Sequence, residues 1–347
     1  MKRLLALLLA VGLVGGAVLV RNRIDDGGSG GGSSSGDGVR LVCGTDLAAT
    51  CERLAQDDPS IDLTVEDEAV TADRLATAPA DGAGFDAWLT AGPWAAIVAD
   101  DRSRAGTDGA VLGDPSKVLA RSPATIVAQQ DRAAALTTAC GGAVSWACIG
   151  RFAGLPWTDA GGQAAWGTVK PGLAGPSTGA GLVALSQAVS SQIGTTDYAS
   201  NDFDDPTLSA WFDQLVGQAK RARAPGQSPV ARFLVLPASF GAVGALEAES
   251  GPSVARAANR SDLRVIYPEP VATADVTLTP AADREASEVL DRIGQDRLLD
   301  ALATDGWRVP GRPAAAGVSA GPSLPAGDGL PAPGVLQFLR GRWEQVP

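Results

Sequence analysis

The chain contains no histidine among its 347 residues. This absence removes Ser-His and Cys-His catalytic pairs and every imidazole metal site. Basic residues are also few, since 28 Lys and Arg stand against 39 Asp and Glu, which gives a net charge of −11. The only short basic run covers residues 220–223, too little for a nucleic-acid surface. The composition therefore argues against most hydrolases and against nucleic-acid binding, and we expect neither a metal nor a cofactor.

Aromatic residues make up only 5% of the chain, yet eight of them are Trp. Apolar residues reach 45% and charged residues 19%, the proportions of a globular protein. The length is enough for two lobes with a sizeable core.

Residues 1–26 contain an apolar run from Leu4 to Val20 with basic residues on both sides. The run is about long enough to span a bilayer, and its end offers no small-x-small cleavage site. We therefore expect an uncleaved signal anchor in the cell membrane, with the folded region outside the cytoplasm. A signal peptide cut near Ala17 or in the following segment is the alternative. Residues 27–38, rich in Gly and Ser, read as a flexible linker.

The four cysteines form two local pairs with the same spacing, Cys43 with Cys51 and Cys140 with Cys148. Neither pair has the C-x-x-C spacing of a zinc or redox site. Two short-loop disulfides in an oxidising compartment are therefore predicted.

Apolar periodicity alternates along the rest of the chain between strand and helix patterns. Strands are expected at residues 39–42, 61–65, 85–90, 233–236, 263–267 and 275–279, with further extended segments at 117–121 and 124–129. Helices are expected at residues 46–56, after 94, from 131, from 179, over 208–216 and over 284–304. This alternation predicts an α/β fold with parallel strands. Residues 311–347 read as a Pro- and Gly-rich strap that ends in a short helix.

Four segments in this order resemble bacterial extracellular solute-binding proteins: residues 119–127, 166–182, 265–269 and 303–310. More narrowly, the chain is similar to the type 2 group that includes molybdate- and sulfate-binding proteins, and to actinobacterial substrate-binding domains related to those fused to von Willebrand factor A modules. The resemblance covers roughly residues 38–310. It implies an α/β, two-lobed fold, with lobe 1 at 39–122 and 270–310 and lobe 2 at 123–269.

The same resemblance implies a hinged clamp that captures a small solute for an ABC importer. The chain departs from the family because it lacks a lipoprotein cysteine and keeps an apolar N-terminal run. A competing hypothesis is therefore a membrane-tethered ectodomain that binds a protein partner or a cell-wall component without transport.

Residues 175–179 (GPSTG) match the G-x-S-x-G pattern of serine hydrolases. Without histidine the triad cannot exist, and Lys170, the nearest lysine, stands in a predicted turn, so we expect no enzyme. Instead, Ser177 and Thr178 are expected to bind a ligand at a helix N-terminus, to cap that helix, or to do both.

Ligands of open α/β sheets bind beyond the carboxyl ends of the strands. This rule selects a largely hydroxyl-bearing set of ligand-binding candidates: Thr45, Asp46, Thr90, Trp94, Ser122, Ser177, Thr178, Ser239 and Tyr267. Such donors suit a small polar or anionic solute. Trp94 is expected either to stack on a ring at the rim of the cleft or to pack in the core, and Tyr267 is expected near the hinge.

Overall fold

The computed structural model describes residues 38–224, 226–319 and 322–347. The expected anchor, and all but the last residue of the expected linker, lie outside these described residues. Within them, no helix is both long enough and apolar enough to cross a bilayer.

The strands of the described chain follow one path, in the order β2-β1-β3-β8-β4-β6-β5, with β7 paired beside this path to β4. Their bounds are β1 (Val39–Gly44), β2 (Ile61–Glu66), β3 (Ala87–Ala91), β4 (Ala120–Gln129), β5 (Pro171–Gly172), β6 (Ala242–Leu246), β7 (Leu263–Ile266) and β8 (Thr273–Pro280). The helices are α2 (Ala48–Asp57), α3 (Glu68–Thr77), α4 (Trp94–Ala105), α5 (Gln130–Ala139), α6 (Trp146–Phe152), α7 (Gly179–Ile193), α8 (Pro206–Ala222), α9 (Pro229–Val235), α10 (Glu247–Arg256), α11 (Ala286–Ile293), α12 (Gln295–Thr304) and α13 (Pro333–Gln345).

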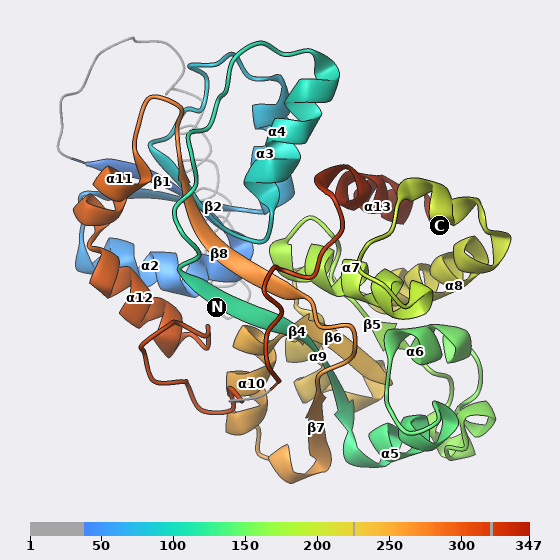
Figure 1. Ribbon diagram of the computed structural model, residues 1–347. Coiled ribbons are helices and arrows are strands. Elements are labelled where there is room, and N and C mark those ends of the chain that lie inside the picture. Colours follow the sequence, from blue (N-terminus) through green and yellow to red (C-terminus); the bar gives the residue numbers. More distant parts are fainter. Residues whose placement is uncertain (1–37, 225, 320–321) are drawn as a thin grey trace, which may run out of the picture. The chain divides into compact units, whose positions relative to one another are not determined.

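Strand β4 runs through both halves of the fold without a break (Figure 1). Its residues up to Pro123 pair with β8, and from Ala124 onward it pairs with β6 and then with β7. The two separate extended segments expected here are therefore one strand. We call β1–β3, β8 and helices α2–α4, α11 and α12 lobe 1, and β5–β7 with α5–α10 lobe 2.

The expectation of parallel strands is met by the pairs β1–β2, β1–β3 and β5–β6 and is wrong for the remaining pairs. Strand β1 pairs in parallel with β2 and β3, but β8 is antiparallel to β3, and β4 is antiparallel to β8, β6 and β7. The reason is that β4 and β8 both extend along the connection between the lobes and run in opposite directions. Alternation of strands and helices in the sequence does not report that reversal.

The strand expected at residues 233–236 is also wrong, because this segment belongs mostly to helix α9. Ser228 caps the helix by accepting a hydrogen bond from the Ala231 N–H at 3.0 Å, and Pro229 occupies its first turn. Both are signals for a helix start. The strand of this region is β6, which follows the short 3-10 helix Pro237–Ser239.

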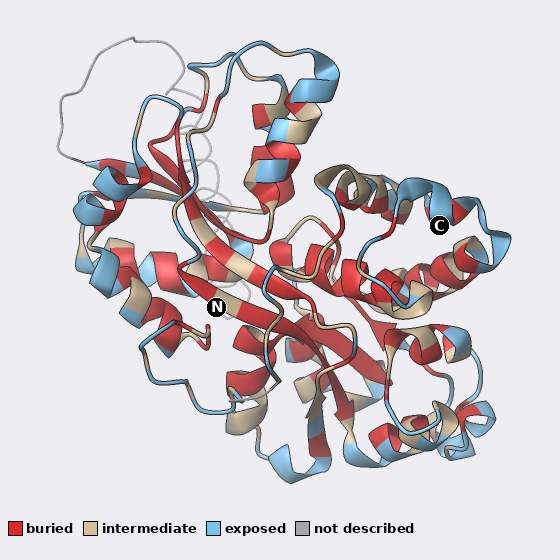
Figure 2. Ribbon diagram, in the orientation of Figure 1, coloured by how far each residue is buried: buried red, intermediate tan, exposed pale blue. Residues whose placement is uncertain are grey.

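Buried residues fill the interior of the described fold (Figure 2). The apolar clusters lie mainly in one lobe or the other, but α7 contributes Leu182 and Val183 to the clusters of lobe 1. Trp88 and Trp94 pack in lobe 1, while Trp146, Trp157 and Trp211 pack in lobe 2. Trp211 is 7% exposed, as the spacing of the α8 apolar face predicts. Most Trp residues are therefore structural.

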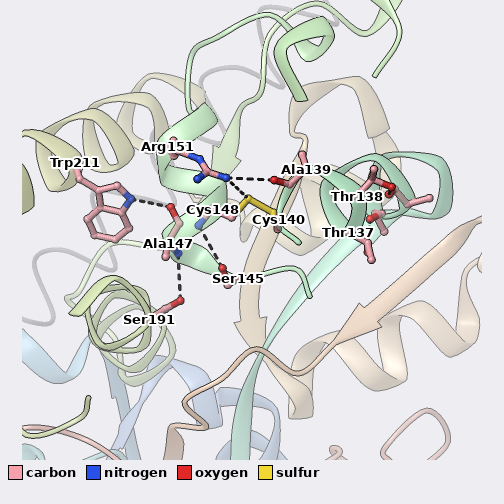
Figure 3. The surroundings of a disulfide bond; sticks show 12 residues. Thr137, Thr138, Ala139, Cys140, Ser145, Ala147, Cys148, Arg151, Ser191 and Trp211 are labelled. Atoms are coloured by element: carbon pink, nitrogen blue, oxygen red, sulfur yellow. Dashed lines mark hydrogen bonds between the residues drawn. A yellow bond between two sulfur atoms is a disulfide. The ribbon is translucent and has the colours of Figure 1, made fainter. Parts of the chain in front are cut away.

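Both predicted disulfides are present, Cys43–Cys51 and Cys140–Cys148. Around the second bond, the Ser145 hydroxyl accepts the Cys148 N–H at 3.3 Å, and the Arg151 guanidinium donates to the Ala139 carbonyl at 3.3 Å (Figure 3). The bond thus joins the end of α5 to the start of α6.

Candidate functional site

The N-terminus of α7, a lobe 2 helix, contacts lobe 1 directly. The Ala180 N–H donates a hydrogen bond to the Asp46 carboxylate, which lies at the end of β1, at 2.5 Å. A methyl group added at Gly179 would lie only 1.9 Å from the Ala91 carbonyl oxygen at the end of β3. The helix N-terminus that we expected to bind an anion thus already has a carboxylate of the protein itself as its partner.

Asp67 bridges the two lobes beside this contact. Its carboxylate accepts the Thr45 hydroxyl at 2.6 Å from lobe 1 and the Ser177 hydroxyl at 2.8 Å from lobe 2. The Thr178 hydroxyl accepts the Gly181 N–H at 3.2 Å and caps α7. The structure therefore brings Thr45, Asp46, Ser177 and Thr178 together, and their binding of a ligand stays a prediction.

Two carboxyl groups at this interface, those of Asp46 and Glu68, have raised pKa values. Burial, reinforced by the negative charges of Glu249 and Asp67, raises the pKa of Asp46 to about 7. Burial and the charge of Asp46 also raise the pKa of Glu68 well above its ordinary value. Glu68 is fully buried, and neither of its carboxylate oxygens has a hydrogen-bond partner among the described residues.

A cavity of about 400 Å³ lies between the two lobes next to Asp46. From lobe 1 it is lined by the start of α2 and the end of α12, and from lobe 2 mainly by α10. Its lining residues are Thr45, Asp46, Ala49, Thr50, Ala180, Ser228, Leu246, Ala248, Glu249, Pro252, Ser253, Arg256, Thr304, Asp305 and Trp307. The volume is within the range of small-molecule sites.

Four ionisable side chains line this cavity. Asp305 is already engaged, because it accepts the Thr50 hydroxyl at 2.7 Å and the Arg53 guanidinium at 2.6 Å. Glu249 accepts the Ser228 hydroxyl, and burial raises its pKa. Arg256 is exposed and makes no ion pair within the described part of the chain. The cavity therefore offers two carboxyl groups that are not paired with a cation among the described residues, Asp46 and Glu249, and one free guanidinium.

Two expected site residues of lobe 1 do not line this cavity. Thr90 and Trp94 are both 0% exposed. The expectation that Trp94 lies at the rim of the cleft is wrong: its ring packs among Ile97 and Val98, and the Arg340 guanidinium covers it at 5.4 Å from the ring centre. Trp94 is a core residue, the other role considered for it.

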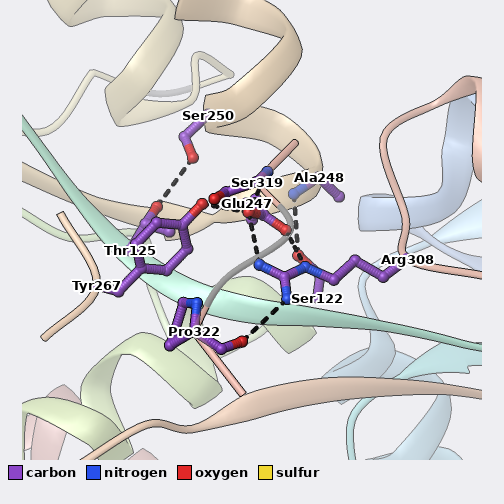
Figure 4. A network of polar contacts seen from close by, with 9 residues as sticks. All are labelled: Ser122, Thr125, Glu247, Ala248, Ser250, Tyr267, Arg308, Ser319 and Pro322. Atoms are coloured by element: carbon purple, nitrogen blue, oxygen red, sulfur yellow. Dashed lines mark hydrogen bonds and ion pairs between the residues drawn. The ribbon is translucent and has the colours of Figure 1, made fainter. Parts of the chain in front are cut away.

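Ser122 and Tyr267 take part in a polar network where the lobes connect (Figure 4). The Ser122 hydroxyl accepts the Ala248 N–H at 2.9 Å at the start of α10. The Tyr267 hydroxyl donates to the fully buried Glu247 carboxylate, which also pairs with Arg308 at 2.5 Å. Tyr267 thus lies near the connection between lobes, as expected, but its partner is a protein carboxylate.

Ser239 lies in a different place. It lines a second cavity, of about 560 Å³, together with Lys170, Arg221 and Arg232 of lobe 2. Lys170 is thus in that cavity, whereas the Ser177 hydroxyl is bonded to Asp67. The two partners of the Ser-Lys pair considered from the sequence are therefore in different surroundings.

Sequence reasoning missed Glu249, Arg256 and Trp307. The first two lie on α10, and the third follows α12. The one available signal was that a helix starts directly after a strand that ends at Leu246. The strand wrongly predicted at residues 233–236 hid this signal. Among the described residues, no three acidic or thiol side chains are grouped as a metal site would require.

No protein-family model matches the chain, and the comparison with curated proteins finds no match. Solved structures are similar in fold. The ferric binding protein from Campylobacter jejuni has a TM-score of 0.56 at 7% identity, covering 89% of this chain and 99% of that chain. A periplasmic thiamin binding protein has a TM-score of 0.53 at 11% identity, covering 91% and 98%.

A third similar structure is the periplasmic binding protein AfuA from Actinobacillus pleuropneumoniae with fructose-6-phosphate bound, with a TM-score of 0.53 at 9% identity, covering 89% of this chain and 98% of that chain. These likenesses give the chain the two-lobed α/β fold of periplasmic solute-binding proteins. The narrower likeness to molybdate- and sulfate-binding proteins, and to domains fused to von Willebrand modules, stays a prediction.

Proposed function

We propose that this chain is an extracytoplasmic solute-binding protein that captures a small polar solute with a cationic group between its lobes, for uptake by an ABC importer. The observation that carries this proposal is the cavity of about 400 Å³ between α2 and α10, with Asp46 and Glu249 in its wall. The similar structures support the class of function, because they are binding proteins for ferric ion, thiamin and a sugar phosphate.

The charge of the cavity favours a cation over the anion expected from the hydroxyl-rich candidate list. Burial raises the pKa of both Asp46 and Glu249, and a cationic group beside them would favour their ionised forms. Arg256 lines the same cavity and suits an anionic group of the same solute. A small amine or zwitterion therefore satisfies more of the lining than an oxyanion does.

A thermal-shift screen of residues 38–347 against amines, zwitterions, sugars and oxyanions tests this proposal. A solute at 100 times its Kd adds about 2.7 kcal/mol to the free energy of unfolding. We expect an amine or zwitterion to raise the melting temperature of the wild-type chain and not of the Glu249→Gln variant. Glu52→Gln is the matched control, because Glu52 is an exposed carboxylate on α2 outside the cavity. A shift caused only by oxyanions would contradict the proposal.

A second proposed function is the membrane-tethered ectodomain that binds a partner without transport. The direct contacts between α7 and lobe 1 favour it, because they leave little separation between the lobes at that point. In both proposals residues 4–20 anchor the chain at the cell membrane. Mass spectrometry of the mature protein tests the anchor, and an N-terminus beyond Ala17 would contradict it.

A further inference from the structure

Helix α13, near the end of the chain, packs against both lobes (Figure 1). Leu336 belongs to the apolar cluster of lobe 1 that contains Trp94. Leu339 and Trp343 belong to the apolar cluster of lobe 2 that contains Phe212. Successive turns of one helix therefore contribute to the cores of different lobes.

Toward lobe 1, the polar contacts of α13 involve partly exposed side chains. The Arg340 guanidinium pairs with the Asp73 carboxylate of α3 at 3.1 Å, and the Asp73 side chain is 60% exposed. The Gln337 amide donates to the Asp101 carboxylate of α4 at 2.7 Å. Each such contact contributes up to about 1 kcal/mol.

Toward lobe 2, α13 is held mainly by apolar burial. Leu339 is 0% exposed and Trp343 is 1% exposed. The Lys220 ammonium of α8 donates to the Trp343 carbonyl at 3.2 Å, and Arg342 pairs with Asp213 at 2.7 Å. Leu339 and Trp343 are buried toward lobe 2, whereas Leu336 alone is buried toward lobe 1, so the attachment to lobe 2 is the stronger one.

The segment before α13 keeps the helix close to the connection between the lobes. The Thr273 N–H at the start of β8 donates to the Asp328 carbonyl at 2.7 Å. The Arg121 guanidinium in β4 donates to the Pro325 carbonyl at 2.8 Å. Release from one lobe would therefore leave α13 near enough to bind again.

We propose that α13 is a latch that stays attached to lobe 2 and holds lobe 1 closed against it through Leu336, Gln337 and Arg340. Hinge opening of the lobes then requires the loss of those three contacts, in addition to the contacts of Leu182 and Val183 of α7 with the apolar clusters of lobe 1. The latch regulates access to the cavity between the lobes. This biological role rests on the proposed function. The contacts themselves do not depend on any solute.

Two arginines of α13 provide a matched test. Arg340 pairs with lobe 1, and Arg342, two residues later, pairs with lobe 2. We would place a dye pair at the exposed positions Ala80 and Ala164 by unnatural amino acids, and measure single-molecule energy transfer in the solute-free full chain in detergent. In Arg340→Ala, the population with separated lobes should rise about fivefold, the effect of losing an ion pair and a cation–π contact. In Arg342→Ala it should not change.

Equal opening in both variants, or opening in neither, would overturn the latch. If Arg340→Ala fails to fold, Asp73→Ala removes the same ion pair from the exposed lobe 1 side but keeps the cation–π contact with Trp94, and must give a smaller opening in the same direction. Because the readout needs no solute, it is independent of the solute screen. A working latch in a protein that binds no solute would contradict only the proposed function.

Discussion

Replacing Gly179 by Ala tests how closely the lobes meet. The added methyl group would lie 1.9 Å from the Ala91 carbonyl oxygen of lobe 1. An ordinary carbon–oxygen contact needs roughly 3.3 Å, so α7 and β3 must separate by about 1.4 Å. Packed interiors do not compress, so the added methyl group should lower the free energy of unfolding by roughly 1–3 kcal/mol. The higher helix propensity of Ala offsets up to about 1 kcal/mol of this loss. We therefore expect the lobes to move apart at the hinge.

Gly181→Ala is the matched control. Its methyl group would lie 1.8 Å from the Gly175 carbonyl oxygen, within the turn of lobe 2 that precedes α7. Small-angle scattering and urea unfolding of both variants separate the effects. Gly179→Ala should increase the radius of gyration, whereas Gly181→Ala should lower the unfolding free energy without that increase. An unchanged radius in Gly179→Ala together with unchanged stability would refute the reasoning.

Three further predictions concern single groups. The pKa of Asp46 is about 7 in the native chain and about 4 when unfolded, so its contribution to stability should fall as the pH rises between these values. Urea unfolding of the wild type and of Asp46→Asn across this pH range checks this prediction. Curves of unfolding free energy against pH that run parallel for the two proteins would contradict it. Ser177→Ala removes the 2.8 Å bond to Asp67 and should lower the unfolding free energy by about 0.5–1.5 kcal/mol in the same assay. Removing the Cys140–Cys148 bond should cost about 2.5 kcal/mol by the chain-entropy relation, and non-reducing peptide mapping should recover that pairing and not a crossed one.

The sequence predicted elements whose apolar pattern is local. Helix α8 is an example, because Leu208, Trp211 and Leu215 share one buried face. Strand β6 was missed because it contains Gly244, a poor strand former. A methyl group there would lie 2.7 Å from the Trp146 ring, so close packing decides this position and not strand preference.

The candidate site divides in the same way. Thr45 and Asp46 line the cavity and follow a strand end, where general rules place ligands, whereas Ser177 does not line it. Glu249 and Arg256 lie on α10, and they line the cavity only because that helix faces α2 across the lobes. Such contacts depend on how the lobes pack against each other. The apolar spacing along the sequence predicts single helices and strands and does not predict that packing. The roles of Trp94 and Tyr267 likewise depend on their tertiary partners, Arg340 and Glu247.

A crystal structure of residues 38–347 with the strongest amine or zwitterion from the screen tests the central claim most directly. Our account predicts solute density in the cavity between α2 and α10, with its cationic group beside Asp46 and Glu249. Solute bound instead in the basic cavity beside Lys170 and Arg232, with the cavity between the lobes left vacant, would contradict the account.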